Sequence, residues 1–229
     1  MLKSLRYPVQ RQPRRQTPMA TRQLAHSAAD FLPARKTLAA LIRAAHDCQG
    51  CDLYQRATQT VFGEGSAKAR MILVGEQPGD QEDLQGKPFV GPAGRLLDEA
   101  LRAAGIDRDD VYLTNAVKHF KWTPRGKRRL HAKPGSRQIA ACRPWLSAEI
   151  DAIGPEGIVC LGATAAQSLA GPAFRITRQR GELLESPLAR WLLATYHPSA
   201  VLRAPDEDRR QQMRDELIAD LRVAAKALA

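Results

Sequence analysis

The sequence predicts an α/β fold: one three-layer α/β/α domain with a four-stranded parallel sheet. Short apolar runs alternate with segments of helical periodicity, and continuous apolar runs are typical of strands covered by helices on both faces. The 229 residues suffice for one ordinary domain and an appendage. Hydrophobic residues make up 44% and charged residues 26%, which is typical of a soluble globular protein. No apolar run approaches the ~18–20 residues of a membrane span, which excludes an integral membrane protein.

The predicted elements follow in a regular order over residues 34–229. Apolar runs predict strands over residues 70–75, 111–115, 157–162 and 191–196. Apolar periodicity predicts helices over residues 35–46, 93–104, 136–153, 163–170 and 206–227. Ser136 is expected to cap its helix, and Gly105 to end another. Ligands of parallel sheets bind beyond the carboxyl ends of the strands, so the loops that should form the site are 75–92, 115–137, 162–164 and 197–199.

Excess positive charge is confined to two short segments. The formal net charge is +11, from 35 Lys and Arg against 24 Asp and Glu. Residues 1–29 carry six basic side chains and residues 118–137 carry eight, without an acid in either, so the rest of the chain has a net charge of −3. This distribution indicates contact with a polyanion, although solvated basic loops would give the same count.

Residues 1–33 are expected to form a basic, disordered tail, because prolines and many Arg and Gln replace any apolar periodicity. The segment lacks the apolar stretch of a secretory signal, which favours a cytoplasmic location. Its acid-free, Arg-rich start also resembles an organellar transit peptide. Two further explanations stay open: a genuine basic arm, or a start at Met19 that makes residues 1–18 an upstream artefact.

The loop after the first predicted strand is the richest in candidate site residues. It runs from Gly75-Glu76-Gln77-Pro78-Gly79-Asp80 to Pro88-Phe89-Val90-Gly91-Pro92-Ala93-Gly94. Glu76 could act as a base or orient one, and Phe89 could stack on a planar base. The glycine spacing matches neither the dinucleotide nor the P-loop motif. The structural alternative is that Glu76 caps a turn and Phe89 fills a gap.

The four cysteines are too few for a disulfide-stapled secreted scaffold. Cys48 and Cys51 form a CxxC pair, whose short bite suits one metal, and Cys142 and Cys160 could complete a tetrahedral set. Zinc and an iron–sulfur cluster both fit such a set. Buried free cysteines are common, so Cys160 in its apolar strand could equally be a core residue.

Three further motifs lie at or after strand ends. Lys127-Arg128-Arg129-Leu130-His131 combines cations that bind phosphate with a histidine that could be one more phosphate contact. The amide of Asn115 could read the edge of a base or bond neighbouring backbone. In His197-Pro198-Ser199, the histidine could be a donor in the site, or the motif only a helix start.

Taken together, these segments resemble the uracil-DNA glycosylase superfamily, most closely its family 4 enzymes and, near them, the UdgX-type proteins. The segments that carry the resemblance are Cys48-x2-Cys51, Gly75–Gly79, Pro88–Gly94, Thr114–Lys118, Lys127–His131, Cys142, Cys160 and His197–Ser199. Each motif is weak alone, but the ordered set is specific and extends over residues 36–225.

The resemblance implies a pocket for a uracil that has left the DNA stack. Phe89 would stack on the base, and Asn115 would pair with its polar edge and separate uracil from cytosine. His197 would donate a hydrogen bond to O2 as uracil departs as an anion. Gln77 and Asp80 are expected to contact the substrate.

The resemblance also assigns DNA contacts and a cofactor. The expected DNA contacts are Lys127, Arg128, Arg129 and Ser199. A structural [4Fe-4S] cluster would be held by Cys48, Cys51, Cys142 and Cys160. The partner implied is uracil-containing DNA, with single strands favoured, and we expect a monomer.

The resemblance to the UdgX type adds a covalent step. In that type, a histidine in a Lys-Arg-Arg-hydrophobe-His loop attacks the sugar C1′ in place of water. His131 holds this position, Glu76 would orient or polarise it, and Gln77 stands where ordinary family 4 enzymes typically carry Ala. Leu130 in place of the more usual Ile is a small departure. The expected function is therefore excision of uracil followed by capture of the abasic site by His131.

Two alternatives stay open. A conventional family 4 enzyme would turn over repeatedly, with His131 only contacting DNA. A non-catalytic, zinc-stabilised nucleic-acid-binding module would be colourless and release no base. Glu76, Asn115 and His197 at three strand ends argue against the second alternative, because phosphate binding does not need them.

Overall fold

A five-stranded sheet organises the protein, whose computed structural model describes residues 27–229. The strands lie in the order β2 (Val111–Asn115), β1 (Met71–Gly75), β5 (Gly157–Leu161), β7 (Ala189–Thr195) and β6 (Leu184–Ser186). The first four are parallel, which confirms the predicted α/β class and parallel sheet. The fifth strand, β6, was not predicted; it is a short antiparallel edge strand that pairs with β7.

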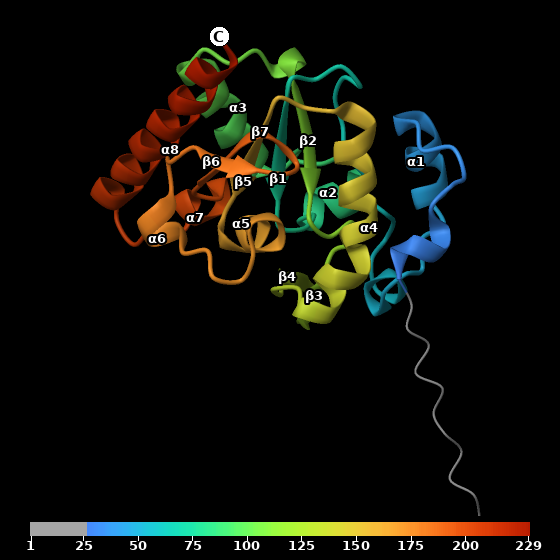
Figure 1. Ribbon diagram of the computed structural model, residues 1–229. Helices are drawn as coiled ribbons and strands as arrows, with labels where there is room; N and C mark the ends of the chain where they lie inside the picture. Colours follow the sequence, from blue (N-terminus) through green and yellow to red (C-terminus); the bar gives the residue numbers. More distant parts are fainter. Residues whose placement is uncertain (1–26) are drawn as a thin grey trace, which may run out of the picture.

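Helices cover both faces of the sheet (Figure 1). One face packs against α3 (Pro92–Ala104), α7 (Pro198–Leu202) and α8 (Glu207–Leu228). The other packs against α4 (Ser136–Ile153) and α5 (Ala163–Ala170). Alternate residues of β1 enter the two cores: Leu73 lies in the first, and Ile72 and Val74 lie in the second. Burial on both faces explains why each parallel strand is a continuous apolar run.

A third core lies on the outer side of α4, where α1 (Leu38–Ala45) packs against it (Figure 1). The 3-10 helices η1 (Ala28–Phe31) and η2 (Asp52–Gln55) contribute to the same core. Ala28 is only 1% exposed, so the end of the tail predicted over residues 1–33 belongs to the folded domain. The rest of that prediction falls on residues 1–26, which lie outside the described part of the chain.

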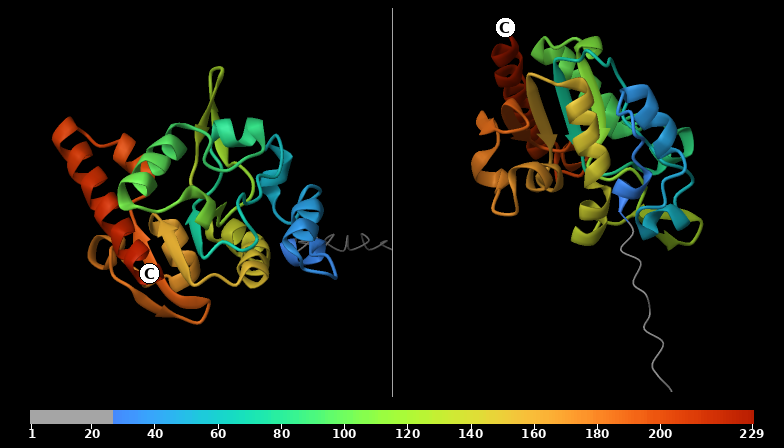
Figure 2. Two further views of the ribbon diagram at one scale, coloured as in Figure 1. Left: turned by 90° about the horizontal axis from the view of Figure 1, so that it is seen from above. Right: turned by 45° about the vertical axis from the view of Figure 1, so that its right-hand side comes forward.

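Several short elements lie in segments for which neither a helix nor a strand was predicted. They are α2 (Asp80–Gln85), η3 (Arg108–Asp110), α6 (Ile176–Gln179) and an antiparallel hairpin of β3 (Trp122–Arg125) and β4 (Arg128–His131). The hairpin stands out from the body of the domain (Figure 2). Its turn contains Gly126, whose φ of +58° suits the first position of a two-residue hairpin turn.

The predicted cap of α4 is off by one residue. Gly135, not Ser136, precedes the helix as its N-cap, and its amide N–H donates to Gln138 Oε1 at 2.9 Å. Gln138 thus accepts the N–H of the N-cap residue itself, whereas a serine at the N-cap would have accepted an N–H from the first turn of the helix. Within residues 27–229, no helix is both long and apolar enough to span a membrane.

Candidate active site

A pocket of about 610 Å³ opens at the carboxyl ends of the parallel strands. Its lining comes from every parallel strand end: Glu76 follows β1, Asn115 ends β2, Gly162 follows β5 and His197 lies beyond β7. Eight of the residues predicted from the sequence line this single pocket: Glu76, Gln77, Asp80, Phe89, Asn115, His131, His197 and Ser199. The rule that ligands bind at these ends of a parallel sheet therefore identified the correct edge.

The floor of the pocket is built by a close approach at Gly75. A Cβ atom there would lie 2.3 Å from Asn115 Oδ1 and 2.8 Å from Phe89 Cζ, so a larger residue would displace both side chains. Phe89 is the one non-glycine residue with positive φ (57°) in the described chain, a conformation that costs on the order of 1–3 kcal/mol. A Cβ on Gly94 would lie 1.7 Å from Phe89 O, so α3 packs directly on this strained backbone. The phenyl ring is therefore held in place by its surroundings.

A buried polar network beneath the pocket floor holds the backbone of Asn115. Lys118 and Glu149 form an ion pair with fully buried side chains, and Lys118 Nζ also donates to the Asn115 carbonyl at 2.9 Å. The hydroxyls of Tyr112 and Thr114 donate to Glu149 Oε1 at 2.9 and 3.0 Å. Burial and the Glu149 charge raise the pKa of Tyr112, which therefore remains a donor. The end of β2 is fixed by charged hydrogen bonds in addition to the sheet.

His197 is held as a neutral hydrogen-bond donor. Burial lowers its pKa to about 4, and the positive charge of Arg203 acts in the same direction, as does that of His131 when its ring is protonated. Its Nδ1 accepts the Ser199 backbone N–H at 3.1 Å, which leaves the proton of the neutral ring on Nε2. The Phe89 ring stacks on the imidazole with centroids 6.2 Å apart. The Ser199 hydroxyl also lies 2.8 Å from Nδ1, so this residue supports His197 in addition to lining the pocket.

Glu76 and His131 meet across the pocket, although they are 55 residues apart in the chain. His131 Nε2 lies 3.4 Å from Glu76 Oε1, and the other carboxylate oxygen accepts a hydrogen bond from the Thr164 hydroxyl. Burial lowers the pKa of His131, while Glu76 partly opposes this shift and Arg203 adds to it. The ring is therefore neutral at pH 7, as a nitrogen nucleophile requires.

Gln77 lines the pocket, but its side chain binds the protein. Its Nε2 donates to the carbonyls of Lys121 and Ala132, both at 3.1 Å, and its Oε1 accepts the Lys121 N–H. These two residues flank the β3–β4 hairpin, which carries His131 at its end. The amide thus ties together the base of the hairpin, whereas the sequence analysis expected a substrate contact.

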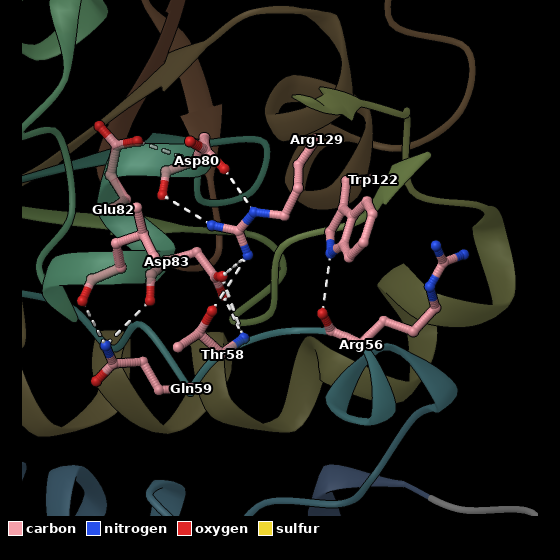
Figure 3. Close-up of polar contacts among 10 residues, drawn as sticks. Arg56, Thr58, Gln59, Asp80, Glu82, Asp83, Trp122 and Arg129 are labelled. Atoms are coloured by element: carbon pink, nitrogen blue, oxygen red, sulfur yellow. Dashed lines mark hydrogen bonds and ion pairs between the residues drawn. The ribbon is translucent and has the colours of Figure 1, made fainter. Parts of the chain in front are cut away.

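Arg129 likewise turns inward (Figure 3). Its guanidinium binds Asp80 Oδ1 and Asp83 Oδ2, both at 2.6 Å, and donates to the Thr58 hydroxyl at 3.1 Å. The side chain is 19% exposed, and the Asp83 side chain is fully buried. Arg129 was predicted to contact DNA and Asp80 the substrate, but their charges pair with each other and fasten the hairpin to α2.

Two other predicted DNA contacts lie at the tip of the hairpin. Lys127 and Arg128 are exposed, and neither lines the pocket. Trp122, at the start of β3, contacts the Arg56 guanidinium 4.5 Å from its ring centroid and donates from Nε1 to the Arg56 carbonyl (Figure 3). The aromatic ring therefore supports the base of the hairpin and leaves the two cations exposed to solvent.

Only three of the four cysteines lie together. Cys48 and Cys142 are buried in the core between α1 and α4, and Cys51 packs against that core. Burial raises the pKa of Cys142 to about 12, and the neighbouring Cys51 and Cys48 add to the rise. Cys160 lies in the core between the sheet and α5, where burial is the one cause that raises its pKa. The structure does not bring together the set of four predicted from the sequence.

Among the pocket residues that were not singled out from the sequence are Thr164, Tyr196, Leu202 and Arg203. Thr164 lies in the predicted strand-end loop 162–164, so the topology rule named its position but not its role. Arg203 follows His197 by six residues and influences both histidines. The short helix α7 lies between the two residues and turns the chain, so that Arg203 lines the same pocket as His197.

Comparisons with known proteins agree with this architecture. The family model of the uracil DNA glycosylase superfamily matches residues 62–222. A type-4 uracil-DNA glycosylase of Archaeoglobus fulgidus is 39% identical over 191 residues, which cover 80% of this chain and 88% of the relative. One of Thermotoga maritima is 39% identical over 171 residues, covering 74% and 85%. A type-5 enzyme of Pyrobaculum aerophilum is 28% identical over 152 residues, covering 59% and 63%. The chain therefore belongs to the uracil-DNA glycosylase superfamily.

Proposed function

We propose that this protein excises uracil from DNA and then binds the abasic sugar covalently through His131. The observation that carries the proposal is the convergence of two sets of side chains in one pocket. Phe89, Asn115 and His197 form a site for a planar polar base, and His131 faces Glu76 at its rim. A non-catalytic phosphate-binding module would need neither set.

The excision step uses the buried part of the pocket. Phe89 stacks on the extruded base, and the Asn115 amide pairs with its polar edge. As the C1′–N1 bond breaks, its electron pair stays on the uracil ring, and the Nε2–H of His197 donates to the O2 oxygen that gains charge. A neutral donor suits this role because it carries its proton at pH 7 without forming a fixed ion pair.

The capture step uses the hairpin. A lone pair of the neutral His131 ring forms a bond to the electron-poor C1′, and the ring becomes an imidazolium that retains one N–H. The Glu76 carboxylate faces the ring at 3.4 Å and stabilises this charge. Release of uracil thus leaves a protein–DNA bond, and one chain is consumed for each lesion. Single-stranded DNA is the favoured substrate, since extrusion of its bases costs least.

A denaturing gel separates this proposal from ordinary turnover. The full chain is incubated with a single-stranded oligonucleotide that contains one uracil, and free uracil and gel-shifted DNA are both quantified. We expect a shifted band that survives heat and SDS, equal in amount to the uracil released. His131→Ala should release uracil without a shifted band. Release by the wild-type chain without a shifted band, over many turnovers, would establish the conventional enzyme instead.

We further propose that Cys48, Cys51 and Cys142 contribute to binding a [4Fe-4S] cluster. The donor chemistry fits, because thiolates hold such clusters and these three thiols share one buried region, but a fourth ligand other than Cys160 is required. No group of three or more His, Cys, Asp or Glu side chains between residues 27 and 229 has an arrangement that would hold a metal ion. Iron analysis and the visible spectrum of the purified protein test this assignment. Cys142→Ala should remove iron and colour, and Cys160→Ala should retain both; retention of iron by Cys142→Ala would contradict it.

A further inference from the structure

The hydroxyl of Thr164 hydrogen-bonds to Glu76, the residue that faces His131. Thr164 is the second residue of α5, is 6% exposed and lies in the pocket. Its hydroxyl donates to Glu76 Oε2, while Oε1 of the same carboxylate faces His131 Nε2. The two oxygens of Glu76 therefore serve two different partners.

This contact removes the freedom that the Glu76 side chain would otherwise keep. The backbone of Glu76 is fixed where its carbonyl accepts the Val117 N–H at 3.1 Å, at the end of the parallel pairing of β1 with β2. The side chain itself still has three rotatable bonds, and Thr164 is its one hydrogen-bond donor among the described side chains. A single hydrogen bond thus determines which oxygen is presented to His131.

We propose that Thr164 is a positioning residue for the capture step and acts on His131 through Glu76. This inference rests on the covalent capture proposed above. Capture turns a neutral ring into an imidazolium, so a carboxylate in the correct place stabilises the product of that step and much less the neutral ring before it. Excision depends instead on Asn115, Phe89 and His197, whereas the hydrogen bond of the Thr164 hydroxyl goes to Glu76.

Loss of the Thr164 hydroxyl should change the fraction of abasic sites that are captured, and should not cause a general loss of activity. Without the hydroxyl, Glu76 is free to rotate away from His131, and capture should slow by roughly tenfold, as expected for loss of a hydrogen bond to a charged group. Uracil release should fall much less. More abasic sites would then leave the protein unbound and be open to attack by water.

The test uses four single variants of the full chain in single-turnover assays that follow uracil release and adduct formation together. Thr164→Val and Thr164→Ala both remove the hydroxyl, so a folding defect in one does not decide the result. Thr164→Ser retains the hydroxyl and should restore capture. Ser168→Ala is the matched control, because it also removes a hydroxyl from α5. The Ser168 hydroxyl donates to the Ala165 carbonyl at 2.7 Å and makes no hydrogen bond to Glu76.

A double-mutant cycle with Glu76→Gln shows whether Thr164 acts through that residue. If it does, Thr164→Val should change the ratio of adduct to free abasic site in the wild-type background and hardly at all in the Glu76→Gln background. Equal loss of release and capture in Thr164→Val, or full additivity with Glu76→Gln, would overturn the inference. Absence of an adduct in the wild-type chain would instead refute the proposed capture itself.

Discussion

The floor of the pocket and the β3–β4 hairpin support their functional residues in opposite ways. Asn115 ends the edge strand β2, pairs in register with Gly75 of β1 and is 3% exposed. His131 ends a two-stranded hairpin, and its side chain is 49% exposed. The first is fixed by the sheet with its two apolar cores and by the buried Lys118–Glu149 pair. The second is held by polar contacts of Gln77 and Arg129.

This difference separates the two proposed steps. Base recognition and bond cleavage depend on residues at the strand ends, so substitutions of these residues should reduce both uracil release and the capture that follows it. Capture depends on a projecting hairpin that a few hydrogen bonds hold against the pocket. Removing one of those bonds should therefore change the fate of the abasic sugar while the domain and the excision step persist.

The largest expected effect concerns the pocket. His197→Ala removes the donor to the departing base and should slow uracil release by roughly 100- to 1,000-fold, with capture reduced in parallel. Single-turnover release of uracil from a single-stranded oligonucleotide measures it. His46→Ala, which changes a histidine whose side chain is 82% exposed, is the control. Slower capture with unchanged release would contradict the role given to His197.

The next effect concerns the hairpin. Arg129→Ala leaves Asp83 buried without its guanidinium partner and frees β4 from α2. Capture should fall by about tenfold, the order expected for a lost charged hydrogen bond, while release falls less. Arg190→Ala removes another arginine ion pair, with Glu156 at the opposite end of the sheet, and should behave as wild type. Equal reduction of both steps by Arg129→Ala would show that the hairpin is not separable from the pocket.

These expectations define what the sequence could and could not reveal. The strands were predicted because burial on both faces gives continuous apolar runs, and their ends located Glu76, Asn115 and His197. The hairpin was missed because its strands are short and largely exposed, so neither carries an apolar pattern. Without it, the partners of Gln77 and Arg129 could not be known, since they lie 44 to 71 residues away in the chain.

The cysteines show a related limit. The spacing allowed Cys160 to join the other three and the family resemblance assigned it to them, because a sequence does not show which way a side chain points from a buried strand. The side chain of Cys160 lies in the same core as Ile158, two residues earlier on β5. Cys48 and Cys142 lie on the outer side of α4, so the helix separates the two groups.

A smaller effect should appear with pH. Burial keeps the pKa of His131 below its ordinary value of 6.5, so the nucleophile is mostly neutral at pH 7 and becomes protonated as the pH falls through its lowered pKa. Capture should be nearly constant above pH 7 and decline as the pH falls below 6.5. Glu76 raises the pKa of His131, so Glu76→Gln should move this decline to lower pH as well as slow the reaction. If the decline moved to higher pH in Glu76→Gln, Glu76 would not be raising the pKa of His131, and its proposed role beside the nucleophile would be wrong.

The smallest effect concerns the tip of the hairpin. Lys127 and Arg128 are exposed, and each should contribute one phosphate contact. The double variant Lys127→Ala/Arg128→Ala should bind single-stranded DNA a few-fold less tightly, and the slope of log K against log salt should fall by about 1.4. Affinity titrations of His131→Ala chains at several salt concentrations measure this without covalent trapping. An unchanged salt slope would show that the DNA backbone does not contact Lys127 and Arg128.

Peptide mass spectrometry of the adduct, after nuclease trimming and proteolysis, tests the covalent bond itself. The account predicts one modified residue, His131, carrying the sugar that remains after uracil departs. A sugar on a lysine of the hairpin, or an unmodified His131 in DNA-bound chains, would contradict it.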